Sequence, residues 1–390
     1  KMVSTRVAFA VLLLSACVLA QTDAYSMGMS SLSPSQRAFA KGTGAGLARG
    51  VPLRPSMLRG GGGITMGAGG YLSSLNAGAS PMAGASTNLV PPSSPSESTK
   101  LTPQSAAKMI DETEVFIFDC DGVIWRGEVL IDGVGEVLNK LRAAGKKVFF
   151  VTNNSTKSRK GYKSKFDSLG LDVQAEEIFS SSFAAAAYLE QTRFKDTGKK
   201  VYIVGEVGIQ EELDLVGVPW IGGEEDKTKT IELKKGYALP HDSNVGAVVC
   251  GFDRYINYYK IQYAQLCINE NPGCEFIATN LDAVTHLTDA QEWAGNGAMT
   301  GALKGCTGQE PTVVGKPSPL MIDYLTDKFK IEPSKIMIVG DRLDTDVLFG
   351  NNNGCKSTLV FSGVTTPDKY MGPDNKIAAF YYGNSIVDFF

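Results

Sequence analysis

Short apolar runs alternate with amphipathic segments in the part of the chain that follows residue 105. Four of these runs predict buried strands, namely residues 115–118, 147–151, 335–339 and 356–360. The segments 133–144 and 158–169 have helical spacing, and each is followed by a glycine, which commonly ends a helix. Strands that alternate with helices indicate an α/β fold with a doubly wound parallel sheet. Ligands of such sheets bind beyond the carboxyl ends of the strands.

Four polar motifs accompany this pattern, and three of them stand at or just after a predicted strand. They are Asp-Cys-Asp-Gly-Val at 119–123, Val-Thr-Asn-Asn-Ser at 151–155, Gly-Lys-Pro-Ser at 315–318 and Gly-Asp-Arg-Leu-Asp-Thr-Asp at 340–346. Each motif alone is weak, because such strings are ordinary turns or helix caps. Their order and strand context together predict one site that removes a phosphoryl group from a small molecule with the help of a metal ion.

A long segment separates the second motif from the third. Between Thr152 and Lys316 lie 163 residues, and one further strand–helix unit accounts for only part of them. The remainder has its own pattern, with predicted strands at 201–204 and 245–250 and predicted helices at 206–216 and 257–270. We therefore expect a second α/β domain, a cap at 194–309, inserted into a core formed by 105–193 and 310–390.

Asp119 and Asp121 stand two residues apart at the end of the first predicted strand. A carboxylate is ionised at neutral pH and can attack phosphorus to form an aspartyl-phosphate. Asp121 can protonate the leaving alkoxide and then take a proton from the water that cleaves the acyl-phosphate. The first of these steps requires that neighbouring charge raise the pKa of Asp121.

Attack on a phosphate dianion requires cations, because one pair of like charges costs about 4 kcal/mol at 4 Å and an effective dielectric of 20. Mg²⁺ suits an all-oxygen site. Asp119, Asp121 and Asp341 would provide the acidic oxygens, with the backbone carbonyl of Asp121 as an alternative to its side chain. The other predicted site residues would bind phosphoryl oxygens, neutralise the transferring charge or orient the metal ligands: Thr152, Asn153 and Asn154 for the first task, Lys316 for the second and Asp346 for the third.

The first hundred residues differ from the rest of the chain. Basic residues precede an apolar stretch at 7–20, which is short for a membrane span and is followed by small residues. Residues 1–24 therefore resemble a secretory signal peptide, with a single membrane anchor as the alternative. Residues 25–104 contain one acidic side chain, Glu97, among many Ser, Gly, Ala and Pro, which is typical of a disordered transit peptide. This order predicts a complex plastid that is reached through the secretory route.

With its four motifs the chain resembles the haloacid dehalogenase superfamily of phosphatases. The position of the insert after the second motif is similar to that in the subgroup with a large α/β cap, which includes pyridoxal, 4-nitrophenyl and phosphoglycolate phosphatases. The segments 251–255, 276–293 and 339–346 resemble the chloroplast phosphoglycolate phosphatases of plants and algae. This resemblance covers residues 101–390, whereas the long leader departs from the plant form.

The resemblance implies Asp119 as the nucleophile, Asp121 as the acid and base, and Mg²⁺ held by both together with Asp341. It implies phosphate contacts on Thr152, Asn153, Asn154 and Lys316. The implied reaction in the chloroplast stroma is hydrolysis of 2-phosphoglycolate to glycolate and phosphate, the first step of photorespiratory salvage. A phosphatase for pyridoxal phosphate, or one of broad range that includes 4-nitrophenyl phosphate, is the alternative. A catalytically inactive binding protein of the same fold is a remoter one.

The cap is expected to choose the substrate, and its segment 279–286 could lean over the site. The resemblance places His286 where pyridoxal phosphatase has a substrate-contacting histidine, and a surface or structural role is the alternative. Trp125, which follows the first motif, is expected to pack rather than to border the pocket. A net charge near −3 gives no reason to expect nucleic acid or an acidic membrane as a partner. The expected partners are a small phosphoester and, since related capped enzymes often form dimers, a second copy of the chain.

Overall fold

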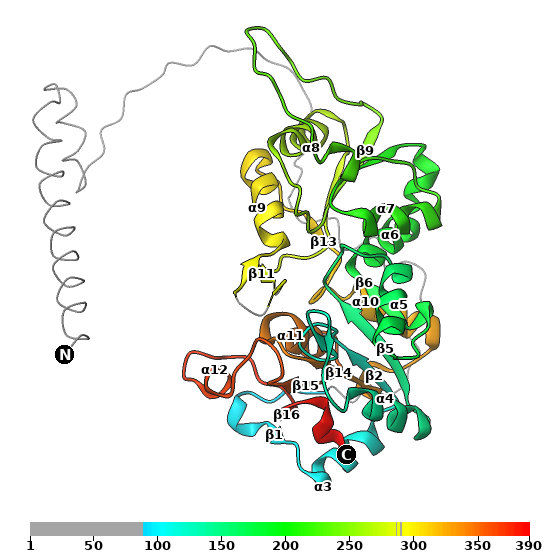
Figure 1. The fold of residues 1–390 in the computed structure, drawn as a ribbon, viewed down its shortest axis with the longest axis vertical. Helices are drawn as coiled ribbons and strands as arrows, with labels where there is room; N and C mark the ends of the chain where they lie inside the picture. The colour runs from blue at the N-terminus through cyan, green and yellow to red at the C-terminus, as the bar shows by residue number, and fades with distance from the viewer. Residues whose placement is uncertain (1–88, 286, 289–290) are drawn as a thin grey trace, which may run out of the picture. The chain divides into compact units, whose positions relative to one another are not determined.

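The computed structural model describes residues 89–285, 287–288 and 291–390, and the larger sheet of this part has seven strands (Figure 1). All pairings in this sheet are parallel, in the order β1-β16-β15-β14-β2-β5-β6. Its strands are β1 (Thr99–Lys100), β2 (Val115–Phe118), β5 (Lys147–Thr152), β6 (Ile178–Ser180), β14 (Ile336–Gly340), β15 (Lys356–Val360) and β16 (Tyr381–Gly383). The four strands predicted from apolar runs are confirmed to within one residue at each end.

Helices pack on both faces of this sheet because the side chains of each strand alternate between two apolar clusters. Phe116 and Phe118 belong to the cluster that contains residues of α3 (Pro103–Glu112), α4 (Val134–Ala143) and α5 (Arg159–Ser168). Val115 and Ile117 belong to the other cluster, with residues of α6 (Ser181–Gln191), α10 (Leu320–Phe329) and α11 (Leu348–Asn352). This alternation confirms the predicted doubly wound α/β core.

A second sheet of five strands forms the inserted cap. Its pairings are also parallel, in the order β13 (Thr312–Val313), β10 (Glu275–Ala278), β9 (Val245–Cys250), β7 (Lys200–Val204) and β8 (Trp220–Gly222). Figure 1 shows α8 (Tyr258–Glu270) and α9 (Asn296–Thr307) on one side of these strands, with α6 and α7 (Val207–Val216) on the other. The strands and helices predicted within the cap are confirmed to within one residue.

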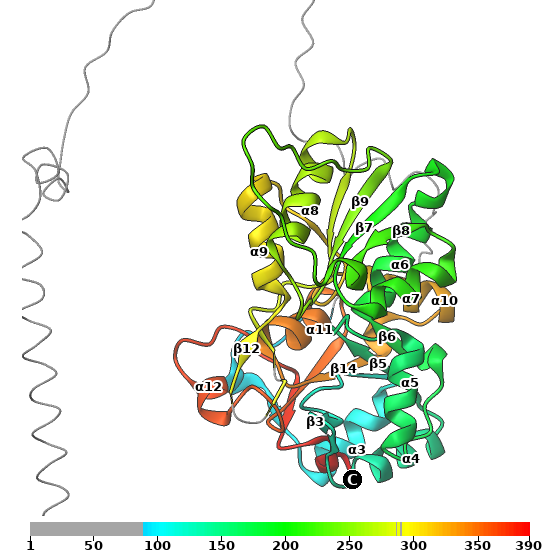
Figure 2. The ribbon, with the colours of Figure 1, turned by 45° about the horizontal axis from the view of Figure 1, so that its top comes forward.

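Two antiparallel ribbons complete the sheets, and both are visible in Figure 2. One pairs β3 (Trp125–Arg126) with β4 (Val129–Leu130), and the other pairs β11 (Val284–Thr285) with β12 (Trp293–Ala294). The remaining elements are α12 (Pro367–Met371), the π-helical turn η6 (Leu343–Val347), and the short turns η1 (Pro95–Glu97), η2 (Ala175–Glu177), η3 (Phe194–Thr197), η4 (Gly223–Asp226), η5 (Pro333–Lys335) and η7 (Ile386–Phe389). The turn η6 leads directly into α11, so the chain begins to turn within the fourth motif, at Leu343.

Two short strands lie just outside the predicted bounds of the domain whose sheet they join. Strand β1 pairs with β16 although it lies before residue 105, the expected start of the core. Strand β13 pairs with β10 in the cap sheet although it lies after residue 309, the expected end of the cap. Both strands are two residues long, which is too short to produce an apolar pattern that the sequence alone would reveal.

The predicted signal peptide at 1–24 and the transit-like segment up to residue 88 lie outside the described residues. Within the part of the chain that is described, no helix combines the length and the apolar character that crossing a membrane requires. The predicted targeting function therefore rests on the composition of the leader.

Candidate active site

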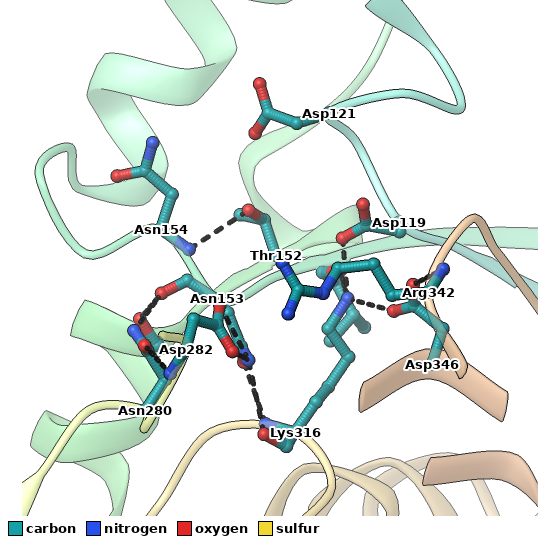
Figure 3. Close-up of polar contacts among 12 residues, drawn as sticks. Asp119, Asp121, Thr152, Asn153, Asn154, Asn280, Asp282, Lys316, Arg342 and Asp346 are labelled. Atoms are coloured by element: carbon teal, nitrogen blue, oxygen red, sulfur yellow. Dashed lines mark hydrogen bonds and ion pairs between the residues drawn. The ribbon is translucent and has the colours of Figure 1, made fainter. Parts of the chain in front are cut away.

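Three polar residues follow neighbouring strands at one edge of the core sheet. Asp119 comes directly after β2, Thr152 is the last residue of β5, and Asp341 comes directly after β14. These strands are adjacent and parallel, so their carboxyl ends meet at the same edge. The third motif reaches this edge as well, because the side chain of Lys316 contacts Asp119 (Figure 3).

A cavity of about 1330 Å³ lies at this edge and is lined by residues of both core and cap. All the site residues that were predicted from the sequence and that the structure describes line it, namely Asp119, Asp121, Thr152, Asn153, Asn154, Lys316, Asp341 and Asp346. The remaining predicted residue, His286, lies outside the described residues. The four distant motifs therefore form one pocket, as expected.

Lys316 is a buried cation between two carboxylates. Its Nζ lies 2.5 Å from Asp119 Oδ1 and 2.6 Å from Asp346 Oδ1, and it also donates to the carbonyl oxygen of Val151 at 3.0 Å. Burial alone would lower the pKa of Lys316, but the charges of Asp119 and Asp346 outweigh burial and raise this pKa above its ordinary value. Lys316 therefore remains an ammonium at neutral pH and holds both carboxylates in place.

The carboxyl groups of Asp119, Asp341 and Asp346 form an acidic cluster. One oxygen from each lies within 4.8 Å of the others, and Lys316 supplies one positive charge against the three. Burial raises the pKa of Asp119 well above its ordinary value, although Lys316 acts in the opposite direction, and burial together with Asp346 raises the pKa of Asp341 to about 7. The cluster thus has an excess of negative charge that a divalent cation would balance.

Asp341 gives the clearest sign that this cluster suits a cation. Its carboxyl group is buried, Oδ2 accepts a hydrogen bond from the amide of Val364 at 2.6 Å, and Oδ1 has no hydrogen-bond partner among the described residues. Buried polar atoms are normally paired, and a bound cation would pair this carboxylate oxygen, which lies beside two other carboxyl groups. Oxygen donors of this kind are those that Mg²⁺ prefers.

Glycines allow the backbone to approach Asp341 closely. A Cβ at Gly363 would lie 1.9 Å from Asp341 Oδ2, and one at Gly122 would lie 2.7 Å from the same atom. Gly122 also has a φ of +85°, a left-handed conformation that favours glycine. The turn at Gly122 therefore brings the first motif against the carboxyl group of the fourth.

The side chain of Asp121 is not part of the acidic cluster. Its Oδ1 accepts a hydrogen bond from Trp125 Nε1 at 2.9 Å, and Figure 3 shows it pointing away from Asp346 and Lys316. Trp125 is fully buried and packs edge to face on Phe166 at 4.9 Å between ring centroids, so the prediction that it packs is confirmed. The geometry therefore separates the two aspartates of the first motif into different environments, and the cluster contains Asp346 in place of the Asp121 carboxylate.

The asparagine side chains of the second motif mainly bind neighbouring protein groups and hold them in place, rather than facing the cavity. Asn154 donates its amide to Thr152 Oγ1 at 3.1 Å, and its own side-chain oxygen accepts from Thr156. The side chain of Asn153 donates to Asp282 Oδ1 at 3.1 Å and contacts the backbone of Lys316. The hydroxyl hydrogen of Thr152 and the backbone of this turn are thus the groups that a phosphoryl oxygen can meet here.

This arrangement, in which Asp119 after β2 contacts Lys316 and shares an acidic cluster with Asp341 and Asp346 after β14, coincides with matches to known proteins. The family model of haloacid dehalogenase-like hydrolases matches residues 116–219, and a HAD-hydrolase-like model matches residues 313–388. Chloroplastic phosphoglycolate phosphatase 1A of Arabidopsis thaliana is 63% identical over 287 residues, which cover 73% of this chain and 79% of the relative. The chain belongs to the haloacid dehalogenase-like hydrolases.

Further members of this hydrolase family share its sequence and its fold. Phosphoglycolate phosphatase 2 of Arabidopsis thaliana is 53% identical over 290 residues, covering 74% of this chain and 96% of the relative. The solved p-nitrophenyl phosphatase of Archaeoglobus fulgidus is 32% identical with a TM-score of 0.58, covering 71% of this chain and 97% of that one. Glycerol phosphate phosphatase of Mycobacterium tuberculosis, solved in complex with magnesium, is 26% identical with a TM-score of 0.60, covering 72% and 78%.

Among the polar residues that line the cavity of this hydrolase without having been predicted, three lie close to the predicted site residues. Asn280 and Asp282 come from the cap after β10, and Arg342 follows Asp341 in the core. Asn280 donates to the carbonyl of Asn153 at 2.6 Å, and the half-buried Asp282 accepts from the side chain of the same residue. Arg342 stands inside the fourth motif, and its position after a predicted strand was the available signal. For Asn280 and Asp282, the only sequence signal was the expectation that the segment 279–286 leans over the site.

Proposed function

We propose that this chain is a Mg²⁺-dependent phosphoglycolate phosphatase, which hydrolyses 2-phosphoglycolate to glycolate and phosphate. One observation carries the proposal: Asp119 lies 2.5 Å from Lys316 at the carboxyl end of β2, in a chain that is 63% identical to a chloroplastic phosphoglycolate phosphatase. The contact supports phosphoryl transfer to a carboxylate, and the identity supports the substrate.

In this proposal the attacking atom is a carboxylate oxygen of Asp119. Oδ1 accepts from Lys316, and the other oxygen attacks phosphorus while the bond between phosphorus and the ester oxygen breaks. Asp121 gives its proton to the departing glycolate oxygen. A water molecule then transfers a proton to the Asp121 carboxylate and attacks the aspartyl-phosphate, which releases phosphate and restores Asp119.

The neighbouring residues stabilise charge and orientation during these steps. Lys316 offsets negative charge on Asp119 and on the transferring phosphoryl group, and Asp346 holds its ammonium from the other side. The hydroxyl of Thr152 and the backbone amide of Asn153 would bind phosphoryl oxygens, while the amide of Asn154 orients the Thr152 hydroxyl. The hydrogen bond from Trp125 keeps the carboxyl group of Asp121 away from the acidic cluster, where it is free to exchange protons with the leaving group and water.

Asp119 and Asp341, with the backbone carbonyl of Asp121, would hold the Mg²⁺ ion, and Asp346 would orient them. The unpaired Oδ1 of Asp341 and the excess negative charge of the cluster support this assignment. When bound, the ion supplies charge neutralisation for the phosphoryl oxygens. The solved relative in complex with magnesium supports the choice of metal.

Phosphate release by the purified protein with Mg²⁺ tests the proposal. We expect a higher kcat/KM for 2-phosphoglycolate than for pyridoxal phosphate or 4-nitrophenyl phosphate. Asp119→Asn removes the nucleophile and should abolish turnover of all three esters, whereas Asp374→Asn, at an exposed position outside the cavity, should leave turnover unchanged. Retained hydrolysis in Asp119→Asn would rule out the aspartyl-phosphate route.

The same panel separates the alternatives. A higher kcat/KM for pyridoxal phosphate or 4-nitrophenyl phosphate would reverse the choice of substrate and favour the broad-range phosphatase. No phosphate release from any ester with Mg²⁺ would favour the inactive binding protein, although both carboxyl groups of the first motif and Lys316 are present in the cavity.

We also propose that the protein works in the stroma of a complex plastid. The acid-poor composition of residues 25–104 and the chloroplastic relatives support this location. A fluorescent protein fused to residues 1–104 should accumulate in the plastid, and secretion of the fusion would contradict the proposal. The expected homodimer can be tested by sedimentation of the purified protein, where a monomer at micromolar concentration would contradict it.

A further inference from the structure

The carboxylate of 2-phosphoglycolate needs a binding group inside the same cavity as the phosphoryl site. Only one methylene group separates this carboxylate from the ester oxygen, so its partner must lie beside Lys316 and Asp119. Among the described residues that line the cavity, three carry a positive charge: Arg126, Lys316 and Arg342. Lys316 already contacts two carboxylates, which leaves the two arginines as the cations for this task.

Arg126 is the weaker of the two candidates. It lies on β3 and is exposed, and its Nε donates to the carbonyl oxygen of Ser362 at 2.7 Å. The attraction of an exposed guanidinium for an anion is screened by water and salt.

Arg342 is anchored directly to the phosphoryl site. It follows Asp341 in the chain, and its backbone amide donates to Asp346 Oδ2 at 3.1 Å. Its side chain is only 16% exposed, so its charge acts in a largely desolvated position. Figure 3 shows this side chain extending across the site toward Asp282, and the two groups are close enough for their charges to interact.

The guanidinium of Arg342 has donors that the protein does not use fully. Its Nε and Nη2 pair with Asp344 at 3.3 and 3.0 Å, and the Asp344 side chain is 65% exposed, which makes this pair a weak one. Among the residues that the structure describes, its Nη1 contacts only the carbonyl oxygen of Val284, at 3.4 Å, which is long for a hydrogen bond. Asp282 competes little for these donors, because it already accepts from Asn153 and burial raises its pKa.

We propose that Arg342 binds the carboxylate of the substrate through Nη1 and Nη2, the latter released from its weak pair with the exposed Asp344, and so makes the enzyme select a phosphorylated 2-hydroxy acid over a phosphate ester of the same size that lacks a carboxylate. A planar guanidinium matches a carboxylate with two parallel hydrogen bonds, which a lysine cannot do. This assignment rests on the proposed function and adds to it the residue that reads the acid group of the substrate.

The test compares 2-phosphoglycolate with ethyl phosphate, in which a methyl group replaces the carboxylate. The full-length protein is assayed with Mg²⁺ as wild type, Arg342→Gln and, as the matched control, Arg126→Gln. We expect the ratio of kcat/KM for 2-phosphoglycolate to kcat/KM for ethyl phosphate to fall about 10- to 100-fold in Arg342→Gln, since a charge-assisted hydrogen bond is lost. The ratio in Arg126→Gln should equal that of the wild type.

Two results would overturn the assignment. One is an unchanged ratio in Arg342→Gln, and if both activities fall equally this indicates a role toward the phosphoryl group or the fold; the other is a lowered ratio in Arg126→Gln. If Arg342→Gln does not fold, Arg342→Lys keeps the charge without the planar fork, and its ratio should fall about 3- to 10-fold; an unchanged ratio there would also overturn the assignment. A wild type that hydrolyses both esters equally well would instead reject the proposed function itself.

Discussion

The side-chain amide of Asn153 holds both polar groups of the Lys316 backbone. Lys316 donates its amide to Asn153 Oδ1 at 2.8 Å, and Asn153 Nδ2 donates to the Lys316 carbonyl at 3.2 Å, although the two residues are 163 positions apart in the chain. Gly315 makes this contact possible, because a Cβ there would lie 2.7 Å from Asn153 Oδ1. The second motif therefore places the lysine of the third motif.

Replacement of Asn153 should impair catalysis through Lys316. Asn153→Ala removes both hydrogen bonds to the Lys316 backbone, and we expect kcat to fall about 10- to 100-fold, because displacement of a reacting group by about 1 Å can have an effect of this size. Steady-state kinetics with Mg²⁺ measure the change. Asn269→Ala, an exposed amide outside the cavity, serves as the control. Wild-type kcat in Asn153→Ala would show that the clamp does not position Lys316.

A methyl group at Gly363 should disturb the proposed metal site. Its Cβ would lie 1.9 Å from Asp341 Oδ2, so Gly363→Ala must move Asp341, whereas a Cβ at Gly301 would meet nothing within 4 Å. We expect the Mg²⁺ concentration for half-maximal activity to rise at least about 10-fold in Gly363→Ala, as for other changes to residues that orient metal ligands. Gly301→Ala should match the wild type. Equal activation curves for both variants would contradict the assignment of Asp341 to the metal.

Lys316 should also contribute to folding stability. Lys316→Met removes the only cation in contact with Asp119 and Asp346 among the described residues, and both carboxyl groups remain buried. Breaking a buried ion pair by removal of one partner typically costs about 3–5 kcal/mol. Urea unfolding without added metal should show a loss of this order, together with loss of activity. The exposed Lys328→Met is the control, and an equal free energy of unfolding in the two variants would refute the prediction.

Metal affinity should depend on pH near neutrality. Without metal, burial and Asp346 raise the pKa of Asp341 to about 7, so a proton competes with the cation below that pH. Affinity for Mg²⁺ should therefore increase as pH rises from 6 to 8 and then level off. Titration calorimetry of the metal alone at pH 6, 7 and 8 measures this, and a constant affinity over the range would contradict it. In Asp341→Asn the dependence should be much weaker.

Much of the fold could be predicted because its strands are long and apolar. β2 and β5 are buried almost throughout, and buried strands produce continuous apolar runs. The polar residues at their ends, Asp119 and Thr152, follow from the rule that parallel strands present their carboxyl ends at one edge. The strands β1 and β13 could not be found in this way, because two residues carry no periodicity.

The contacts between motifs were harder to predict from the sequence than the strands. The sequence grouped Asp121 with the metal ligands because it stands beside Asp119, but its side chain turns to Trp125, and Asp346 joins the cluster through Lys316 instead. Arg342 was recognised as part of the fourth motif, but the sequence assigned no role to it. Whether neighbouring residues share a pocket depends on the direction of each side chain, which spacing along an irregular loop does not determine.

The amino-acid sequence determined which chemistry this protein can perform, since the types of side chain and the strands that precede them are local properties. Tertiary structure alone decided which carboxyl groups meet Lys316, that Asn153 clamps its backbone, and that Arg342 extends into the cavity. The physical reason is that these contacts join residues 30 to 197 positions apart, and they form only when the packing of the core brings those residues together.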